Sequence, residues 1–151
     1  MIRGIRFTIP QETTNTLWKI LNRTRICNCT WYNVEDQCEV WTNTPGQVFF
    51  NLPSYNAKDF EKKIQQDHYI IFLKLLAYPE GERFFNIHTY KDFQNSRCQL
   101  LLLIYDCEFV EIFVKSTVIA EIIFNNASLN NYKNIEYITD NNDKRTILDI
   151  L

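Results

Sequence analysis

The alternation of apolar and polar positions predicts a protein in which strands are joined by hairpins. Residues 5–9 and 109–115 alternate with the period of a strand that is buried on one face. Residues 99–105 form the most apolar run, and a short polar turn joins them to 109–115, which predicts the clearest hairpin in the chain. Residues 69–78 are apolar apart from Lys74, as expected for a central strand covered on both faces.

Helices are predicted between these strands. Residues 12–22 carry apolar side chains at helical spacing. Asn56 stands before a first turn that contains an acidic residue, which predicts the cap of a helix ending near residue 66. Thr89 begins a capping-box pattern, and Ser116 precedes the wide apolar stripe of another helix. An Asn-rich loop is predicted at residues 125–134.

Shorter strands are predicted in the remaining segments. The β-prone runs 31–34 and 39–41 are separated by polar residues and predict a hairpin. Further strands are predicted at residues 48–50 and 135–139. Hairpins dominate, and strands and helices do not alternate strictly. We therefore expect an α+β fold with one mostly antiparallel sheet and three to four helices packed mainly on one face, in a single domain over residues 1–151.

Composition and charge place the chain among globular proteins. Apolar residues make up 46% and charged residues 23%, which is unlike a disordered chain. The formal charge of −2 gives no general attraction to nucleic acid or to an anionic membrane. No apolar run approaches the about 20 residues that span a bilayer, and no secretory signal is present. Five cysteines, an odd number, favour free thiols in a reducing cytosol. We therefore expect a soluble, cytoplasmic protein.

The cysteines supply one weak pattern for a metal site. Cys27 and Cys29 are separated by one residue, and Cys38 follows nearby. Zinc ligands are commonly paired with about two to four residues between them, and no fourth ligand lies close in sequence. Small buried or incidental thiols explain the pattern better. We expect no metal and no cofactor, and a metal-stabilised domain remains an alternative.

Enzymatic candidates are equally weak. The two histidines, His68 and His88, stand at predicted element boundaries and belong to no recognisable motif. Gly4, Gly46 and Gly81 are isolated, so a glycine-rich phosphate loop is excluded. A small enzyme that uses Cys or His with carboxylates from separate loops remains an alternative, because the fold can bring distant groups together. No catalytic residue is assigned.

An aromatic and acidic cluster is the strongest functional candidate. Trp31, Tyr32 and Trp41 lie beside the acidic residues Glu35, Asp36 and Glu39. Neighbours along a strand point to opposite faces, so some of these rings face solvent unless a helix covers them; otherwise they complete the core. No Lys or Arg lies between residues 30 and 53, which disfavours nucleic acid. The leading hypothesis is a non-enzymatic domain that binds another protein, similar in composition to immunity proteins.

Six blocks of residues follow one another along nearly the whole chain. They are RGIRFTIP at 3–10, LWKIL at 17–21, LAYPEG at 76–81, TYKDF at 89–93, CQLLL at 98–102 and YITDNNDKRT at 137–146. Together they resemble a small family of uncharacterised proteins, a domain of unknown function, from low-GC Gram-positive bacteria. The resemblance implies a bacterial, cytoplasmic, single-domain protein and carries over no catalytic residue.

Overall fold

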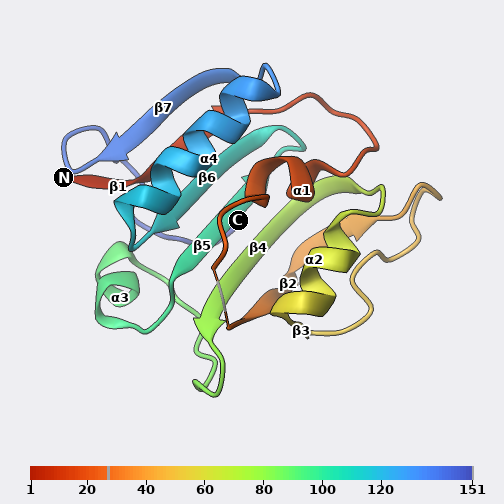
Figure 1. Cartoon of the computed structure of the whole chain (residues 1–151), viewed down its shortest axis with the longest axis horizontal. Coiled ribbons are helices and arrows are strands. Elements are labelled where there is room, and N and C mark those ends of the chain that lie inside the picture. Colours follow the sequence, from red (N-terminus) through yellow and green to blue (C-terminus); the bar gives the residue numbers. More distant parts are fainter. Residues whose placement is uncertain (27, 151) are drawn as a thin grey trace.

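The strands of the computed structural model form one sheet in the order β3-β2-β4-β5-β6-β1-β7, and every neighbouring pair is antiparallel (Figure 1). The structure describes residues 1–26 and 28–150. Its strands are β1 (Ile2–Thr8), β2 (Cys29–Trp41), β3 (Ser54–Asn56), β4 (Tyr69–Pro79), β5 (Leu100–Tyr105), β6 (Phe109–Val114) and β7 (Lys133–Thr139). Its helices are α1 (Thr16–Leu21), α2 (Ala57–Ile64), α3 (Tyr90–Asn95) and α4 (Thr117–Leu129).

The helices are distributed unequally over the two faces of the sheet. α1, α2 and α4 cover one face, here called the helix face, in front of the sheet in Figure 1. The opposite face is covered by α3, by residues 84–87 and by residues 148–150. The α+β class, the antiparallel sheet and the helices packed mainly on one face are therefore confirmed. No helix in the described ranges has the length and apolar character needed to cross a membrane.

The centre of the sheet follows the hydrophobic pattern closely. Along β5, Leu100 and Leu102 pack on the helix face, while Leu101 and Leu103 pack on the opposite face. Burial on both faces explains why this strand is almost wholly apolar. At the turn into β6, Asp106 and Cys107 have positive φ values of 52° and 64°, as tight hairpin turns require.

Three of the predicted helix caps are confirmed. The side chain of Asn56 accepts a hydrogen bond from Asp59 N at 2.8 Å and begins α2. Thr89 caps α3 in the same way at 3.1 Å, and Ser116 caps α4 at 3.3 Å. Each cap satisfies a backbone N–H group that has no partner within its helix.

The predicted hairpin of residues 31–34 and 39–41 is wrong. Both runs belong to the single strand β2, and both pair with β4. The register passes from Asn33 opposite Leu75 to Cys38 opposite Leu73, so four residues of β2 bulge out opposite Lys74. The eleven-residue strand β4 offers a partner along the whole of β2, and the polar residues form a bulge instead of a turn.

Two further boundaries differ from the sequence prediction. The segment 125–134 is helical as far as Leu129, because α4 continues through it. Residues 48–50 make one isolated bridge, between Trp41 and Val48, instead of a strand. The short edge strand β3 was not predicted; it pairs with Thr30–Tyr32 of β2.

Candidate binding site

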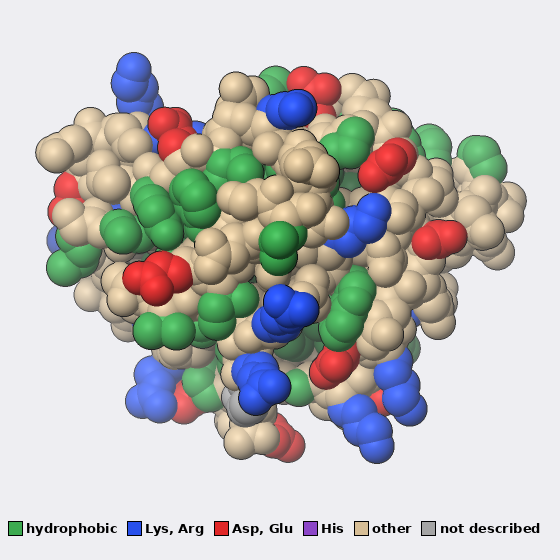
Figure 2. Space-filling view, turned by 45° about the horizontal axis from the view of Figure 1, so that its top comes forward, with side chains coloured by type: hydrophobic (Ala, Val, Ile, Leu, Met, Phe, Trp, Pro, Cys, Tyr) green, Lys and Arg blue, Asp and Glu red, His purple; other side chains and the backbone are tan. Residues whose placement is uncertain are grey.

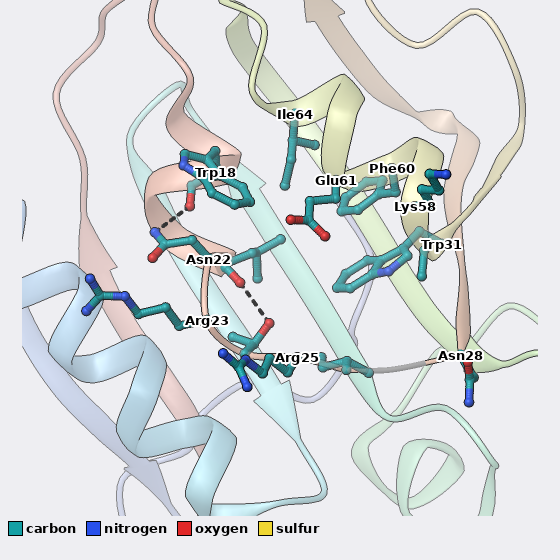
Figure 3. A pocket seen from close by; sticks show the side chains of 14 residues that line it. Trp18, Asn22, Arg23, Arg25, Asn28, Trp31, Lys58, Phe60, Glu61 and Ile64 are labelled. Carbon is teal, nitrogen blue, oxygen red and sulfur yellow. Dashed lines mark hydrogen bonds between the residues drawn. The ribbon is translucent and has the colours of Figure 1, made fainter.

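A hollow of about 580 Å³ opens on the helix face between α1, residues 22–26 and 28, the start of β2 and α2 (Figure 3). We call it the aromatic pocket. Its apolar lining includes Trp18, Leu21, Trp31, Phe60 and Ile64, and its polar lining includes Asn22, Arg23, Arg25, Asn28, Lys58 and Glu61. The volume lies within the range of about 300–1,000 Å³ that is usual for small-molecule sites.

Aromatic rings form the base of the aromatic pocket. Trp31 points from β2 to the helix face and is 5% exposed. Its ring stacks on that of Phe60 from α2, with the ring centroids 4.4 Å apart and the planes within 5°. Trp18 of α1 enters the pocket from the side opposite Trp31 and is half-buried (Figure 3). Trp18 is therefore the more accessible of the two indole groups that line the pocket, because Trp31 is almost wholly covered by its neighbours.

Charged side chains surround this aromatic base. Glu61 of α2 directs its carboxylate into the pocket, between Trp18 and Trp31 (Figure 3). Lys58 stands on the α2 side, and Arg23 and Arg25 stand on the opposite side. Within residues 1–26 and 28–150, none of these four charged groups has an ion-pair partner. Their charges are therefore available to a ligand.

The charged groups that line the pocket are mainly basic, because Arg23, Arg25 and Lys58 stand there beside the carboxylate of Glu61. Lys and Arg side chains are frequent in the lower half of the surface view, and Asp and Glu side chains lie among them (Figure 2). The chain as a whole carries a formal charge of −2. The local positive charge is thus a property of the fold, and the overall composition gives no sign of it.

The backbone that carries the two arginines is strained. Arg23, Arg25 and Asn28 have φ values of 69°, 48° and 57°, in the left-handed region. For a residue other than glycine this conformation costs about 1 kcal/mol or more. The hydroxyl of Thr24, which is 8% exposed, donates a hydrogen bond to Leu21 O at 2.7 Å and holds the segment to the end of α1. Strain at non-glycine residues is typical of functional segments.

A second hollow of about 420 Å³ lies beside the bulge of β2. We call it the acidic hollow. It is lined by Glu35, Glu39, Trp41, Val48, Asn33, Cys38, Val40, Gly46 and Phe50. No Lys or Arg is among the lining residues in the part of the chain that the structure describes. The bulge is what brings Glu35 to the same hollow as Glu39.

The structure divides the six residues of the aromatic and acidic cluster among four places. Trp41, Glu35 and Glu39 come together at the acidic hollow. Asp36 is exposed on the bulge and does not line the hollow. Trp31 lies in the core and at the base of the aromatic pocket. Tyr32 points to the opposite face, where its ring stacks on Phe84 with the centroids 4.5 Å apart. Their predicted role in partner binding stays a prediction.

The structure does not bring Cys29 and Cys38, the described cysteines of the candidate metal pattern, together with other ligands into a metal site. Cys27 lies outside the described residues. Cys29 is 3% exposed at the start of β2. Cys38 lines the acidic hollow, and burial, with a smaller effect of Glu39, raises the pKa of its thiol to about 12. Among residues 1–26 and 28–150, no group of three or more His, Cys, Asp and Glu side chains is placed to hold a metal ion.

Neither histidine lines the aromatic pocket or the acidic hollow. The ring of His68 is buried, and its Nε2 accepts a hydrogen bond from Leu17 N at 3.1 Å. His88 contacts Asp149 through Nδ1 at 2.8 Å, but its side chain is 62% exposed. The small-enzyme alternative requires a histidine beside a thiol or an acid within a pocket. His88 lies beside the carboxylate of Asp149, but it lines neither of the two hollows.

Sequence reasoning missed the polar residues of the aromatic pocket. They come from α2 and from residues 22–26 and 28, which are far from α2 in the sequence, and no motif joins them. The available signal was a pair of arginines, Arg23 and Arg25, in an irregular segment that directly follows Trp18 and Leu21. That signal marks a basic surface loop but does not indicate the carboxylate of Glu61.

Comparisons with known proteins support the resemblance carried by the six sequence blocks. Residues 2–149 match the profile of the family described as "Protein of unknown function (DUF2691)". Over 153 aligned residues the chain is 33% identical to the uncharacterized protein YncE of Bacillus subtilis (strain 168), with 99% of this chain and 100% of that protein covered. No solved structure matches the chain. The expected family of uncharacterised proteins from Gram-positive bacteria is therefore confirmed.

Proposed function

The chain belongs to the DUF2691 family of proteins of unknown function, and we propose that it is a non-enzymatic, cytoplasmic domain that binds a basic segment of a partner protein. The binding surface in this proposal is the acidic hollow beside the bulge of β2. The observation that carries it is the grouping of Glu35, Glu39 and Trp41 around one hollow whose described lining contains no basic residue.

Unpaired carboxylates support this choice of partner. Glu35, Asp36 and Glu39 are exposed, and none of them forms an ion pair within the described residues. A cluster of negative charges increases the association rate of a basic partner and lowers that of an acidic partner. The net charge of −2 is too small to produce this selectivity without such local grouping.

Apolar groups beside the carboxylates support the same proposal. Val48 is 62% exposed at the hollow, and the ring of Trp41 stacks on Tyr69 with the centroids 6.1 Å apart. Lys and Arg side chains pack their aliphatic stems on apolar surface while their charged ends reach carboxylates. A basic segment therefore fits both parts of the hollow, whereas a purely apolar segment would leave the carboxylates unsatisfied.

The test is native mass spectrometry of the tagged protein, isolated gently from its source bacterium. We expect a stoichiometric protein partner. The double variant Glu35→Gln/Glu39→Gln should lower the affinity for that partner on the order of tenfold, because two complementary charges are removed. Raising the salt concentration should weaken the unmodified complex in the same direction.

Matched controls separate this surface from general charge effects. Glu121→Gln removes an exposed carboxylate from α4, far in sequence from the bulge, and should leave the affinity unchanged. Trp41→Ala should weaken the complex. Recovery of the bare chain alone, or a complex that is indifferent to both Glu35→Gln/Glu39→Gln and Trp41→Ala, would refute the proposed surface.

A further inference from the structure

The aromatic pocket combines three features that point to one class of ligand. It has flat ring surfaces at its base, one carboxylate directed inward, and cationic side chains at its rim. The acidic hollow shares none of its lining residues with this pocket. An inference about the ligand of the pocket is therefore independent of the proposed partner surface.

The rings favour a planar ligand. Trp18 and Trp31 enter the pocket from opposite sides, and Phe60 supports Trp31 from behind by stacking (Figure 3). Aromatic side chains in this position bind flat heteroaromatic rings by stacking, largely without regard to the identity of the ring. The rings therefore define a flat ligand but do not select one base from another.

The carboxylate of Glu61 can distinguish one nucleotide base from another. A carboxylate only accepts hydrogen bonds, and its two oxygens together pair best with two adjacent N–H donors. Guanine carries such donors at N1 and at the exocyclic amino group, whereas adenine has an acceptor nitrogen beside its amino group. Since Glu61 has no ion-pair partner among the described residues, its oxygens are available for this contact.

The rim of the pocket carries cationic side chains that can bind an anionic group of the ligand. Arg23, Arg25 and Lys58 are exposed and form no ion pair within the described ranges. Arginine forks match phosphate oxygens, often in pairs, and lysine contributes a further positive charge. The left-handed backbone at Arg23 and Arg25 holds both residues at the edge of the pocket at a conformational cost, which a ligand contact would explain.

We propose that the aromatic pocket binds a guanine nucleotide. The base lies against the half-buried ring of Trp18, next to the covered Trp31–Phe60 pair. Its N1–H and amino groups donate to Glu61, and its phosphates lie at the rim formed by Arg23, Arg25 and Lys58. The volume of about 580 Å³ is sufficient for a ligand of this size.

The test is titration calorimetry of the intact chain with GDP, ADP and IDP, with tryptophan fluorescence as a second readout. GDP should bind and quench the fluorescence. ADP should bind at least tenfold more weakly, because it cannot satisfy both carboxylate oxygens. IDP, which lacks the exocyclic amino group, should lie between the two. No GDP binding at millimolar concentration, or equal affinities for GDP and ADP, would overturn the proposal.

Substitutions assign the contacts. Glu61→Gln should weaken GDP binding about tenfold and reduce the preference for GDP over ADP. Arg23→Gln and Arg25→Gln should weaken GDP more than guanosine, because guanosine lacks the phosphates. The matched surface variants Glu121→Gln and Arg83→Gln should bind GDP as the unmodified chain does. If Glu61→Gln bound GDP unchanged, the assignment of the base edge to this carboxylate would be wrong.

Discussion

At the scale of single residues, His68 acts as a structural cap. Asn15, the residue at the N-cap position before α1, makes no side-chain capping bond, and the ring of His68 accepts the hydrogen bond of Leu17 N instead. Its Nδ1 then carries the proton and donates to Gln66 O at 2.8 Å. Burial lowers the pKa of His68 to about 4, and the hydrogen bond to Gln66 offsets this only in part. The buried ring is therefore neutral, and protonation would remove its capping contact.

This histidine should make stability depend on pH. The unfolded chain takes up the proton near the ordinary pKa of 6.5, and the folded chain takes it up only near 4. The contribution of His68 is therefore fully present above 6.5 and is lost as the pH falls toward 4. We expect the loss of this contribution to lower the free energy of unfolding by about 2–3 kcal/mol when the pH falls from 7 to 4.5. Urea denaturation at both pH values measures the loss.

Two variants isolate the effect of His68 from that of other acidic groups. His68→Gln should be less stable at pH 7 and should lose most of this pH dependence. His88→Gln removes the other histidine and leaves the buried ring of His68 in place, so the loss of stability between pH 7 and 4.5 should persist in this variant. Equal pH dependence in the unmodified chain and in His68→Gln would show that the ring of His68 is not protected from protonation.

At the scale of elements, one buried amide joins α4 to α1. Asn126 is 3% exposed, and its Nδ2 donates hydrogen bonds to Ile20 O at 3.0 Å and to Asn22 O at 2.7 Å. These carbonyls lie at the C-terminal end of α1, in its last turn and at its C-cap residue, where the helix itself supplies no donors. The contact explains why α4 continues through residues that the sequence pattern assigns to a loop. It also holds Asn22, which directly precedes Arg23, against α4.

Removal of this amide should be costly. Asn126→Ala leaves the buried carbonyl of Ile20 and the partly buried carbonyl of Asn22 without their donor, and should lower the free energy of unfolding by about 1–3 kcal/mol. The neighbouring Asn125 is exposed on the same helix, so Asn125→Ala provides a matched control with an expected change within about 0.5 kcal/mol. Chemical denaturation compares the two variants. Equal stabilities would show that the Asn126 contacts contribute nothing in solution.

At the scale of the whole molecule, a C-terminal segment crosses the face of the sheet opposite α1, α2 and α4. Lys74, Leu103 and Glu111 lie opposite one another on adjacent strands. Asp149 pairs with the buried Lys74 at 2.7 Å, and Arg145 pairs with Glu111 at 2.7 Å. Burial would raise the pKa of Asp149, but hydrogen bonds from Lys74, His88 and Gln37 outweigh it and lower the pKa to about 2. The buried charges on β4 and β6 therefore need residues from the end of the chain.

The Lys74–Asp149 pair predicts a specific double-mutant result. Asp149→Ala leaves the fully buried Lys74 without its counter-charge and should lower the free energy of unfolding by about 3–5 kcal/mol. Lys74→Met/Asp149→Ala removes both charges and should recover most of that loss. Urea denaturation of the two single variants and the double variant measures the coupling. A double variant no more stable than Asp149→Ala would contradict a pair held by its charges.

The sequence by itself determined the class of the fold and its central elements. Residues 69–78 and 99–105 are apolar enough to identify buried strands, because burial on two faces removes the need for polar positions. The alternation of apolar and polar residues over 109–115 identified the next strand. The caps at Asn56, Thr89 and Ser116 were equally predictable, since a cap depends on residues within one turn. Helix caps of this kind can be predicted from the sequence because they do not depend on how distant parts of the chain pack.

Only the tertiary structure decided the path of β2 and the composition of the two hollows. The polar residues 35–37 favour a turn locally, but pairing with β4 on both sides makes them a bulge. Glu61 meets Trp18 and Trp31 because α2 packs between elements that are distant in the sequence. Lys74 is buried because Asp149 reaches it from 75 residues away. Contacts between distant segments depend on the packing of the whole sheet, and no local pattern encodes them.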